Sequence, residues 1–159
     1  AGPLRVSLAS GIKQMDIALI NGDDDTNITA KLPESLTKFS ANLLPGQTII
    51  DALAGTPVLA FAGIGQPKRF FATIRKAGCN LVHYLAFADH HPYSETDLVR
   101  LQEDAMRLGA QLVTTQKDWV RLPAEWRERI FVLPVALALD DDGDLLRHVE
   151  TAIAAHKDS

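Results

Sequence analysis

Residues 57–78 read PVLAFAGIGQPKRFFATIRKAG and contain the signals of a strand, a turn and a helix. The first six residues are apolar throughout, which is typical of a strand buried on both faces of a parallel sheet. Gly63 and Gly65 follow, where the backbone can turn tightly. Apolar residues then recur at helical spacing over Phe70–Ala77, and Gly78 gives a stop signal. This stretch predicts a buried strand followed by a helix.

The same alternation extends to both sides of this stretch. Further strands are expected over residues 16–20, 39–44, 81–87, 112–115 and 130–139. Pro134 interrupts the last of them, which places that segment at an edge or a bulge. A helix is expected to begin after the N-cap Ser94 and to end at Gly109, and another amphipathic helix is expected near the end of the chain. This order predicts the α/β class, with a mostly parallel sheet flanked by helices in a single domain over residues 1–159.

Composition excludes several classes of protein. Of the 159 residues, 47% are hydrophobic and 23% are charged, which is ordinary for a globular domain. The net charge of -4 argues against a nucleic-acid partner, which requires clustered Lys and Arg. Cys79 is the single cysteine, so no internal disulfide forms, and a buried or half-buried thiol in a reducing compartment is expected. The chain opens at Ala1 without an initiator Met, and we expect it to be a fragment of a longer protein.

The turn after residue 62 is the first candidate binding segment. Free N–H groups at the helix start, with Lys68 and Arg69 close in sequence, could hold an anion. The third glycine of a dinucleotide fingerprint is missing, and G-x-x-x-x-G-K-[ST] occurs nowhere in the chain. A purely structural turn explains the glycines equally well.

The second candidate is Asp89-His90-His91, directly after an expected strand. Ligands of open parallel sheets gather beyond the carboxyl ends of the strands. An aspartate beside two histidines could bind a metal ion, or could orient an imidazole for proton transfer. Adjacent residues of an extended chain point to opposite sides, so both histidines need not serve one site.

The third candidate runs from Thr114 to Asp118 after another expected strand. Its hydroxyls, Lys117 and Asp118 could hydrogen-bond a nucleotide or a phosphate. Thr115 could equally be the N-cap of a helix, with Asp118 near the positive end of its dipole. The two interpretations are compatible.

Five segments taken in order resemble the later half of the tetraacyldisaccharide 4′-kinases. They are GPLR at Gly2–Arg5, AGIGQPKRFF at Ala62–Phe71, FADHHPY at Phe87–Tyr93, TTQKDWVRL at Thr114–Leu122 and VLPV at Val132–Val135. The resemblance implies a P-loop-kinase-like carboxy-terminal half, whose amino-terminal half with the P-loop lies outside this chain. Val6 stands where family members usually carry Glu, and Gln116 stands at another usual Glu.

The resemblance also implies an activity. Family members use ATP and Mg²⁺ to phosphorylate the 4′-hydroxyl of tetraacyldisaccharide 1-phosphate in lipid A biosynthesis. The resemblance places the enzyme in the cytoplasm, peripherally at the inner face of a Gram-negative inner membrane, with any membrane contact made through the missing half. The partners are then the lipid-linked disaccharide and that missing half. We expect the chain alone to be inactive.

The resemblance assigns roles to particular residues. His90, with Asp89 as its neighbour, would assist an acidic base of the missing half. Phosphate, nucleotide or substrate contacts would fall on a second set: Arg5, Gly63, Gly65, Arg69, Lys117 and Asp118. No metal ligand is expected in this chain.

Two alternatives remain open at this point. One is a manganese phosphoesterase of the kind that carries an Asp-His-His signature, which would bind metal through residues 89–91. The other is a non-catalytic α/β domain that binds a nucleotide or regulates a partner.

Overall fold

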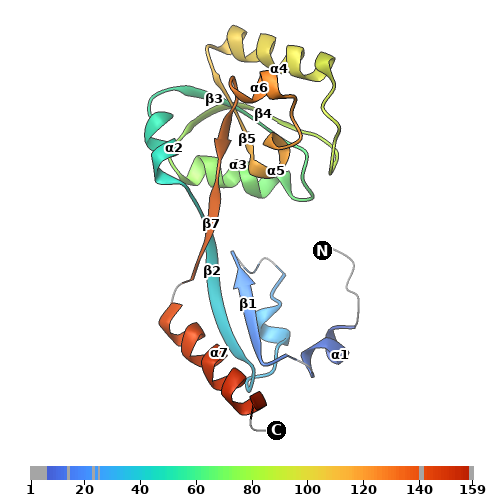
Figure 1. The fold of residues 1–159 in the computed structure, drawn as a ribbon, viewed down its shortest axis with the longest axis vertical. Coiled ribbons are helices and arrows are strands. Elements are labelled where there is room, and N and C mark those ends of the chain that lie inside the picture. The colour runs from blue at the N-terminus through green and yellow to red at the C-terminus, as the bar shows by residue number, and fades with distance from the viewer. Residues whose placement is uncertain (1–6, 14, 23, 25, 140–141, 158–159) are drawn as a thin grey trace. The chain divides into compact units, whose positions relative to one another are not determined.

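The computed structural model describes residues 7–13, 15–22, 24, 26–139 and 142–157. The chain divides into two compact units, shown in Figure 1. Residues 1–43 and 137–159 form the terminal unit, and residues 44–136 form the central unit. The expectation of a single domain stays a prediction.

The central unit contains a parallel four-stranded sheet in the order β4-β3-β5-β6. Its strands are β3 (Pro57–Ala62), β4 (Asn80–Ala86), β5 (Gln111–Thr115) and β6 (Phe131–Leu133). Strand β3 has a neighbour on each side, and Val58–Ala62 are fully buried. The all-apolar run at the centre of the sequence therefore occupies the centre of the sheet, and the predicted parallel α/β architecture is confirmed.

Helices cover both faces of this sheet, and Figure 1 shows α3 and α4 on opposite sides of it. The helices of the central unit are α2 (Gln47–Ala52), α3 (Pro67–Lys76), α4 (Glu95–Leu108), α5 (Gln116–Trp119) and α6 (Ala124–Arg127). Successive side chains of a strand point to opposite faces. Val58, Ala60 and Ala62 accordingly pack in one core cluster with residues of α3. Leu59 and Phe61 pack in the other with residues of α4.

The helix termini follow the signals of the sequence. Ser94 caps α4: its hydroxyl accepts the N–H of Asp97, and the Asp97 carboxylate accepts the N–H of Ser94. Gly109 ends the helix in the left-handed region, with φ of 58°. Thr115 caps α5 in the same way as Ser94, by accepting the N–H of Asp118 at 3.1 Å. The expected cap residues are therefore confirmed.

The terminal unit contains most of the second sheet, in the order β1-β2-β7, while residues 44–45 of β2 and 135–136 of β7 belong to the central unit. Its elements are α1 (Leu8–Ile12), β1 (Ile17–Asn21), the 3-10 helix η1 (Thr29–Lys31), β2 (Thr37–Pro45), β7 (Val135–Leu139) and α7 (Asp142–Lys157). Strands β1 and β2 pair in parallel. Among the described residues, no helix is long and apolar enough to cross a bilayer.

The expectation of one strand over residues 130–139 is wrong. Pro134 separates β6 from β7, and the two strands belong to different sheets. Proline has no N–H to donate to a ladder, so the pairing of the first strand stops there. Both strands lie at an edge of their sheets, as a proline in this segment predicts.

Candidate functional site

Three loops meet at the carboxyl edge of the central sheet. They follow β3, β4 and β5, whose carboxyl ends share one edge because the strands are parallel. The N–H of His90, in the second loop, donates to the carbonyl of Gly63 in the first at 3.0 Å. The N–H of Gly63 donates to Oδ2 of Asp118, after the third strand, at 3.1 Å. The backbone of Gly63 thus joins all three segments.

Asp118 is fully buried, and both oxygens of its carboxylate have hydrogen-bond or ion-pair partners within the chain. Oδ2 accepts the Gly63 N–H and the hydroxyl of Thr115, the latter at 2.7 Å. Oδ1 forms an ion pair with Nη2 of Arg121, one helical turn further along the chain. A buried carboxylate requires such partners, because an unpaired charge away from water is strongly unfavourable.

Arg121 extends the contact to the backbone of the first loop. Its Nη2 donates to the Gly63 carbonyl at 3.0 Å, the same oxygen that accepts the His90 N–H. Its Nε donates to the carbonyl of Lys117 at 3.1 Å. With about a quarter of its side chain exposed (27%), Arg121 closes the outer side of the buried carboxylate.

Gly63 is tightly enclosed on its side-chain side. A Cβ atom there would lie 3.0 Å from the Tyr93 hydroxyl, 3.1 Å from the Ala88 carbonyl oxygen and 3.2 Å from Cβ of His91. The close approach of the 88–93 loop therefore requires a glycine at position 63. The sequence alone predicts a tight turn at this glycine. A Cβ at Gly65 would meet only the Asp89 carboxyl group, with Oδ2 at an ordinary 3.5 Å.

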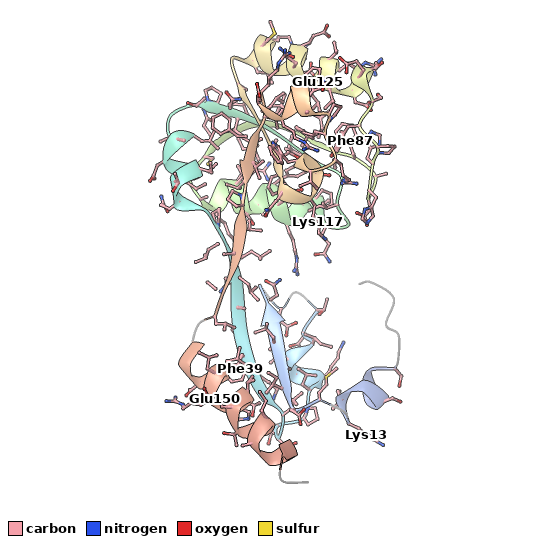
Figure 2. All side chains as sticks on the ribbon, in the orientation of Figure 1. Lys13, Phe39, Phe87, Lys117, Glu125 and Glu150 are labelled. Carbon is pink, nitrogen blue, oxygen red and sulfur yellow. The ribbon has the colours of Figure 1, made fainter. Side chains whose placement is uncertain are left out.

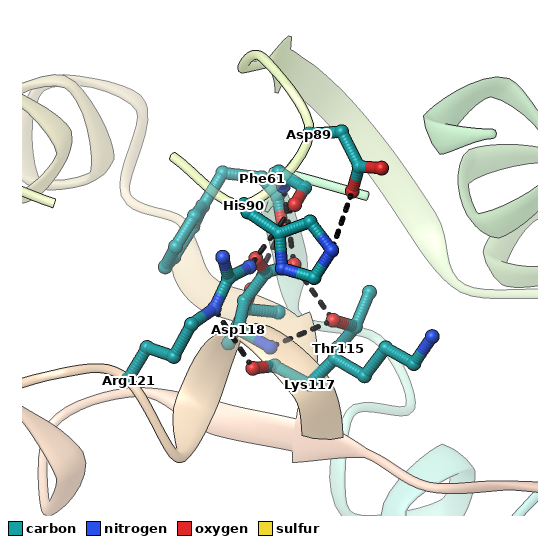
Figure 3. Close-up of polar contacts among 9 residues, drawn as sticks. Phe61, Asp89, His90, Thr115, Lys117, Asp118 and Arg121 are labelled. Atoms are coloured by element: carbon teal, nitrogen blue, oxygen red, sulfur yellow. Dashed lines mark hydrogen bonds and ion pairs between the residues drawn. The ribbon is translucent and has the colours of Figure 1, made fainter. Parts of the chain in front are cut away.

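Asp89 and His90 are the exposed members of the site. The side chain of His90 is 82% exposed, and its Nε2 lies 3.9 Å from Oδ1 of Asp89, which is 55% exposed. His90 has φ of 59°, in the left-handed region that non-glycine residues rarely adopt. The imidazole of His90 and the carboxylate of Asp89 thus lie side by side, as Figure 3 shows, on a loop whose backbone is bonded to Gly63.

His91 belongs to a different set of contacts. Its ring stacks on Phe87, and its Nε2 lies 3.1 Å from Oδ2 of Asp97. Hydrogen bonds from Ser94, and then the bond from His91, lower the pKa of Asp97 to about 2. The adjacent histidines therefore do not converge. Within the part of the chain that the structure describes, no three His, Cys, Asp or Glu side chains are grouped to hold a metal ion.

Tyr93 and Arg121 are site residues that the sequence-based interpretation did not select. Tyr93 is buried (8% exposed) against Gly63, and burial, followed by the nearby charge of Asp118, raises the pKa of its hydroxyl. Both residues lie within the quoted motifs, and Arg121 follows Asp118 at the three-residue spacing that brings side chains together on a helix.

The predicted binding residues are distributed unevenly around this edge. Gly63 and Asp118 are brought together with His90, but both are buried. Arg69, in the first turn of α3, and Lys117, in α5, are exposed. Figure 2 labels the side chain of Lys117. Arg5 lies outside the described residues, as does Val6. A ligand-binding role for these residues stays a prediction.

Comparisons with known proteins agree on one family. A family model described as tetraacyldisaccharide-1-P 4′-kinase matches residues 1–154. The chain is 40% identical over 145 residues to the tetraacyldisaccharide 4′-kinase of Rhodospirillum rubrum, covering 89% of the chain and 44% of the relative. The corresponding kinase of Jannaschia sp. is 43% identical over 149 residues, covering 91% of the chain and 45% of the relative. The chain thus spans about half the length of the curated relatives it matches.

A solved structure shows the same fold. It is LpxK from Aquifex aeolicus in complex with ATP, which superposes with a TM-score of 0.60 at 20% sequence identity. The match covers 93% of this chain and 45% of that chain.

Proposed function

The chain belongs to the tetraacyldisaccharide-1-P 4′-kinase family, and on that premise we propose that it supplies the carboxy-terminal half of a lipid kinase. The complete enzyme would transfer a phosphoryl group from ATP to the 4′-hydroxyl of a tetraacyldisaccharide 1-phosphate in lipid A biosynthesis. The observation that carries the proposal is the exposed His90, held beside Asp89 at the carboxyl edge of a parallel sheet.

Catalysis of phosphoryl transfer requires mainly that the protein position the reacting groups and stabilise the charge that develops on them. The attacking hydroxyl must also lose a proton, and histidine is the side chain best suited to exchange one near neutral pH. In our proposal, His90 orients or tunes an acidic base supplied by the other half of the enzyme, and Asp89 orients the imidazole. Neither residue is proposed to bind the phosphates.

Positive charge at the same edge supports an anionic co-substrate. Arg69 and Lys117 are exposed at the starts of helices that follow β3 and β5. We propose that they, with the exposed backbone of Gly65, face phosphate groups of the nucleotide or the disaccharide. The described residues include no group of three His, Cys, Asp or Glu side chains that could hold a metal ion, and no step of the proposal is routed through Mg²⁺ in this chain.

The cellular setting follows from the same proposal. A lipid-linked disaccharide resides in a membrane while ATP is cytoplasmic. The enzyme would therefore work at the inner face of the bacterial inner membrane, peripherally, through its other half. Since G-x-x-x-x-G-K-[ST] is absent from this sequence, we expect no turnover from the chain alone.

The test is phosphate transfer by the full-length enzyme that contains this chain. We expect His90→Ala to lower kcat about a hundredfold, since general acid–base groups contribute roughly 10²–10⁴, with a smaller change in KM for ATP. His83→Ala is the matched control, because His83 is exposed in the middle of β4 and away from the carboxyl edge. An unchanged kcat in His90→Ala would remove His90 from the mechanism.

A further inference from the structure

Gly63 connects a buried ion pair to the exposed histidine. Its carbonyl accepts two N–H groups at 3.0 Å, one from the His90 backbone and one from Nη2 of Arg121. Its own N–H donates to Asp118, whose carboxylate also pairs with Arg121. The two charged side chains therefore hold both polar groups of one residue, and that residue holds His90.

Little freedom remains for Gly63 to move. Its side-chain side faces Tyr93, Ala88 and His91 at distances that leave no space for a Cβ atom. Its polar groups face Asp118 and Arg121. The position of its carbonyl is consequently set by packing on one side and by charge on the other.

His90 needs an external support because of its backbone conformation. With φ of 59° it occupies a region that is unfavourable for any residue with a side chain. Its imidazole is 82% exposed, so the side chain itself contributes little packing. The backbone bond to Gly63 ties this residue to the end of β3.

We infer that Asp118 and Arg121 are positioning residues that fix His90 through the backbone of Gly63. The inference rests on the proposed function in that it takes His90 to act in phosphoryl transfer. The inference gives Asp118 a role that needs no contact with ATP, metal or lipid. Residues 117–121 then support residues 89–91 through the backbone of Gly63.

A kinetic cycle in the full-length enzyme tests the path from Arg121 to His90. Arg121→Gln is expected to lower kcat about tenfold, since small misplacements of a reacting group are costly, and to change KM for ATP by less than about twofold. In the His90→Ala background the same substitution is expected to cause no further loss. Losses that multiply would overturn the inference, because Arg121 would then act independently of His90.

Arg127→Gln is the matched control for this cycle. Arg127 also donates to backbone carbonyls of the same segment, at 2.9 Å to Leu122 and 2.6 Å to Val120, and neither of these bonds involves Gly63. Its guanidinium also lies over the ring of Trp119. We expect Arg127→Gln to leave kcat near that of the parent, and any small loss to be the same with and without His90.

Hydrogen exchange of residues 87–93 in the full-length protein gives a readout that does not depend on activity. Arg121→Gln should accelerate exchange in this segment about tenfold relative to the parent, because the Gly63 carbonyl loses one of its supports. Arg127→Gln should not. Unchanged exchange in Arg121→Gln would overturn the inference. If His90→Ala leaves kcat unchanged, the proposed role of His90 fails, while the exchange result still decides whether Arg121 holds this loop.

Arg121→Lys serves if Arg121→Gln does not fold. The ammonium keeps a positive charge beside the buried Asp118 but not the planar guanidinium. We expect a smaller loss of kcat, about threefold, again absent in the His90→Ala background. A loss that persists without His90 would overturn the inference here too.

Discussion

Gly63→Ala is the substitution whose cost follows most directly from the structure. The added Cβ would lie at 3.0, 3.1 and 3.2 Å from three atoms of the 88–93 loop, as described above. An ordinary contact needs about 3.5 Å, so each neighbour must withdraw by a few tenths of an ångström. One neighbour is the backbone oxygen of Ala88 and another is Cβ of His91, and neither can rotate away.

The magnitude combines two opposing effects. Inserting a methyl group into a closed space costs about 1–3 kcal/mol. Replacing glycine by alanine returns about 0.4–1 kcal/mol, because the unfolded chain loses conformational freedom. We therefore expect the free energy of unfolding to fall by about 1–2 kcal/mol.

Urea unfolding followed by tryptophan fluorescence measures this loss. Trp119 and Trp126 both pack in the core cluster that contains Phe61 and Tyr93, so the signal reports on the unit that carries the substitution. With a slope of roughly 2 kcal/mol per molar urea, the midpoint should fall by about 0.5–1 M.

Gly65→Ala is the control, because its Cβ would meet only Asp89 at an ordinary distance and its φ is not in the left-handed region. We expect it to be neutral or slightly stabilising. Two results would refute the reasoning: a Gly63→Ala protein as stable as the parent, or a Gly65→Ala protein that loses as much.

Two further predictions concern charges of the central unit. Asp118→Asn leaves Arg121 beside a neutral amide, and the free energy of unfolding measured by urea titration should fall by about 2–4 kcal/mol. Asp104→Asn, in a partly exposed surface pair, is the control and should lower it by no more than about 0.5 kcal/mol. Equal losses in the two variants would contradict a special role for burial. Asp97 has its pKa lowered to about 2, chiefly by bonds from Ser94, so its stabilising effect is complete above the unfolded value near 4 and is lost as the pH falls toward 2. Asp97→Asn should flatten the decline of the thermal midpoint over that interval, and an unaltered decline would contradict the assignment.

Local signals predicted most of the fold. Helix α4 has its N-cap Ser94 and its left-handed Gly109 where the sequence places them, because caps depend on residues within one turn of the chain. Strand β3 was recognisable because its six residues form a continuous apolar run, which is typical of a strand buried on both faces. The interruption at Pro134 was also local, but the assignment of residues on its two sides to different sheets depends on partners distant in sequence.

The candidate site was only half accessible to sequence reasoning. Thr115 could be predicted as a cap from its position, and the structure shows that cap. The bond from Gly63 to Asp118 joins residues 55 apart in the chain, and no periodic pattern reports such a pair. The burial of Asp118 could not be predicted from the sequence either, because Lys117 and Val120, close to it in the chain, are exposed and give no sign of it.

Burial separates two roles that residue type alone does not distinguish. Asp118 and Asp89 both follow strands at the same edge, yet the first is fully buried and the second is 55% exposed. A carboxylate with every bond made inside the protein serves the backbone around it, whereas an exposed one is available to a ligand or to an imidazole. The hydrogen bonds that fix the backbone of His90 join residues of the central unit. An ordered loop saves the entropy that binding would otherwise have to supply, which leaves more of the binding free energy for the transition state.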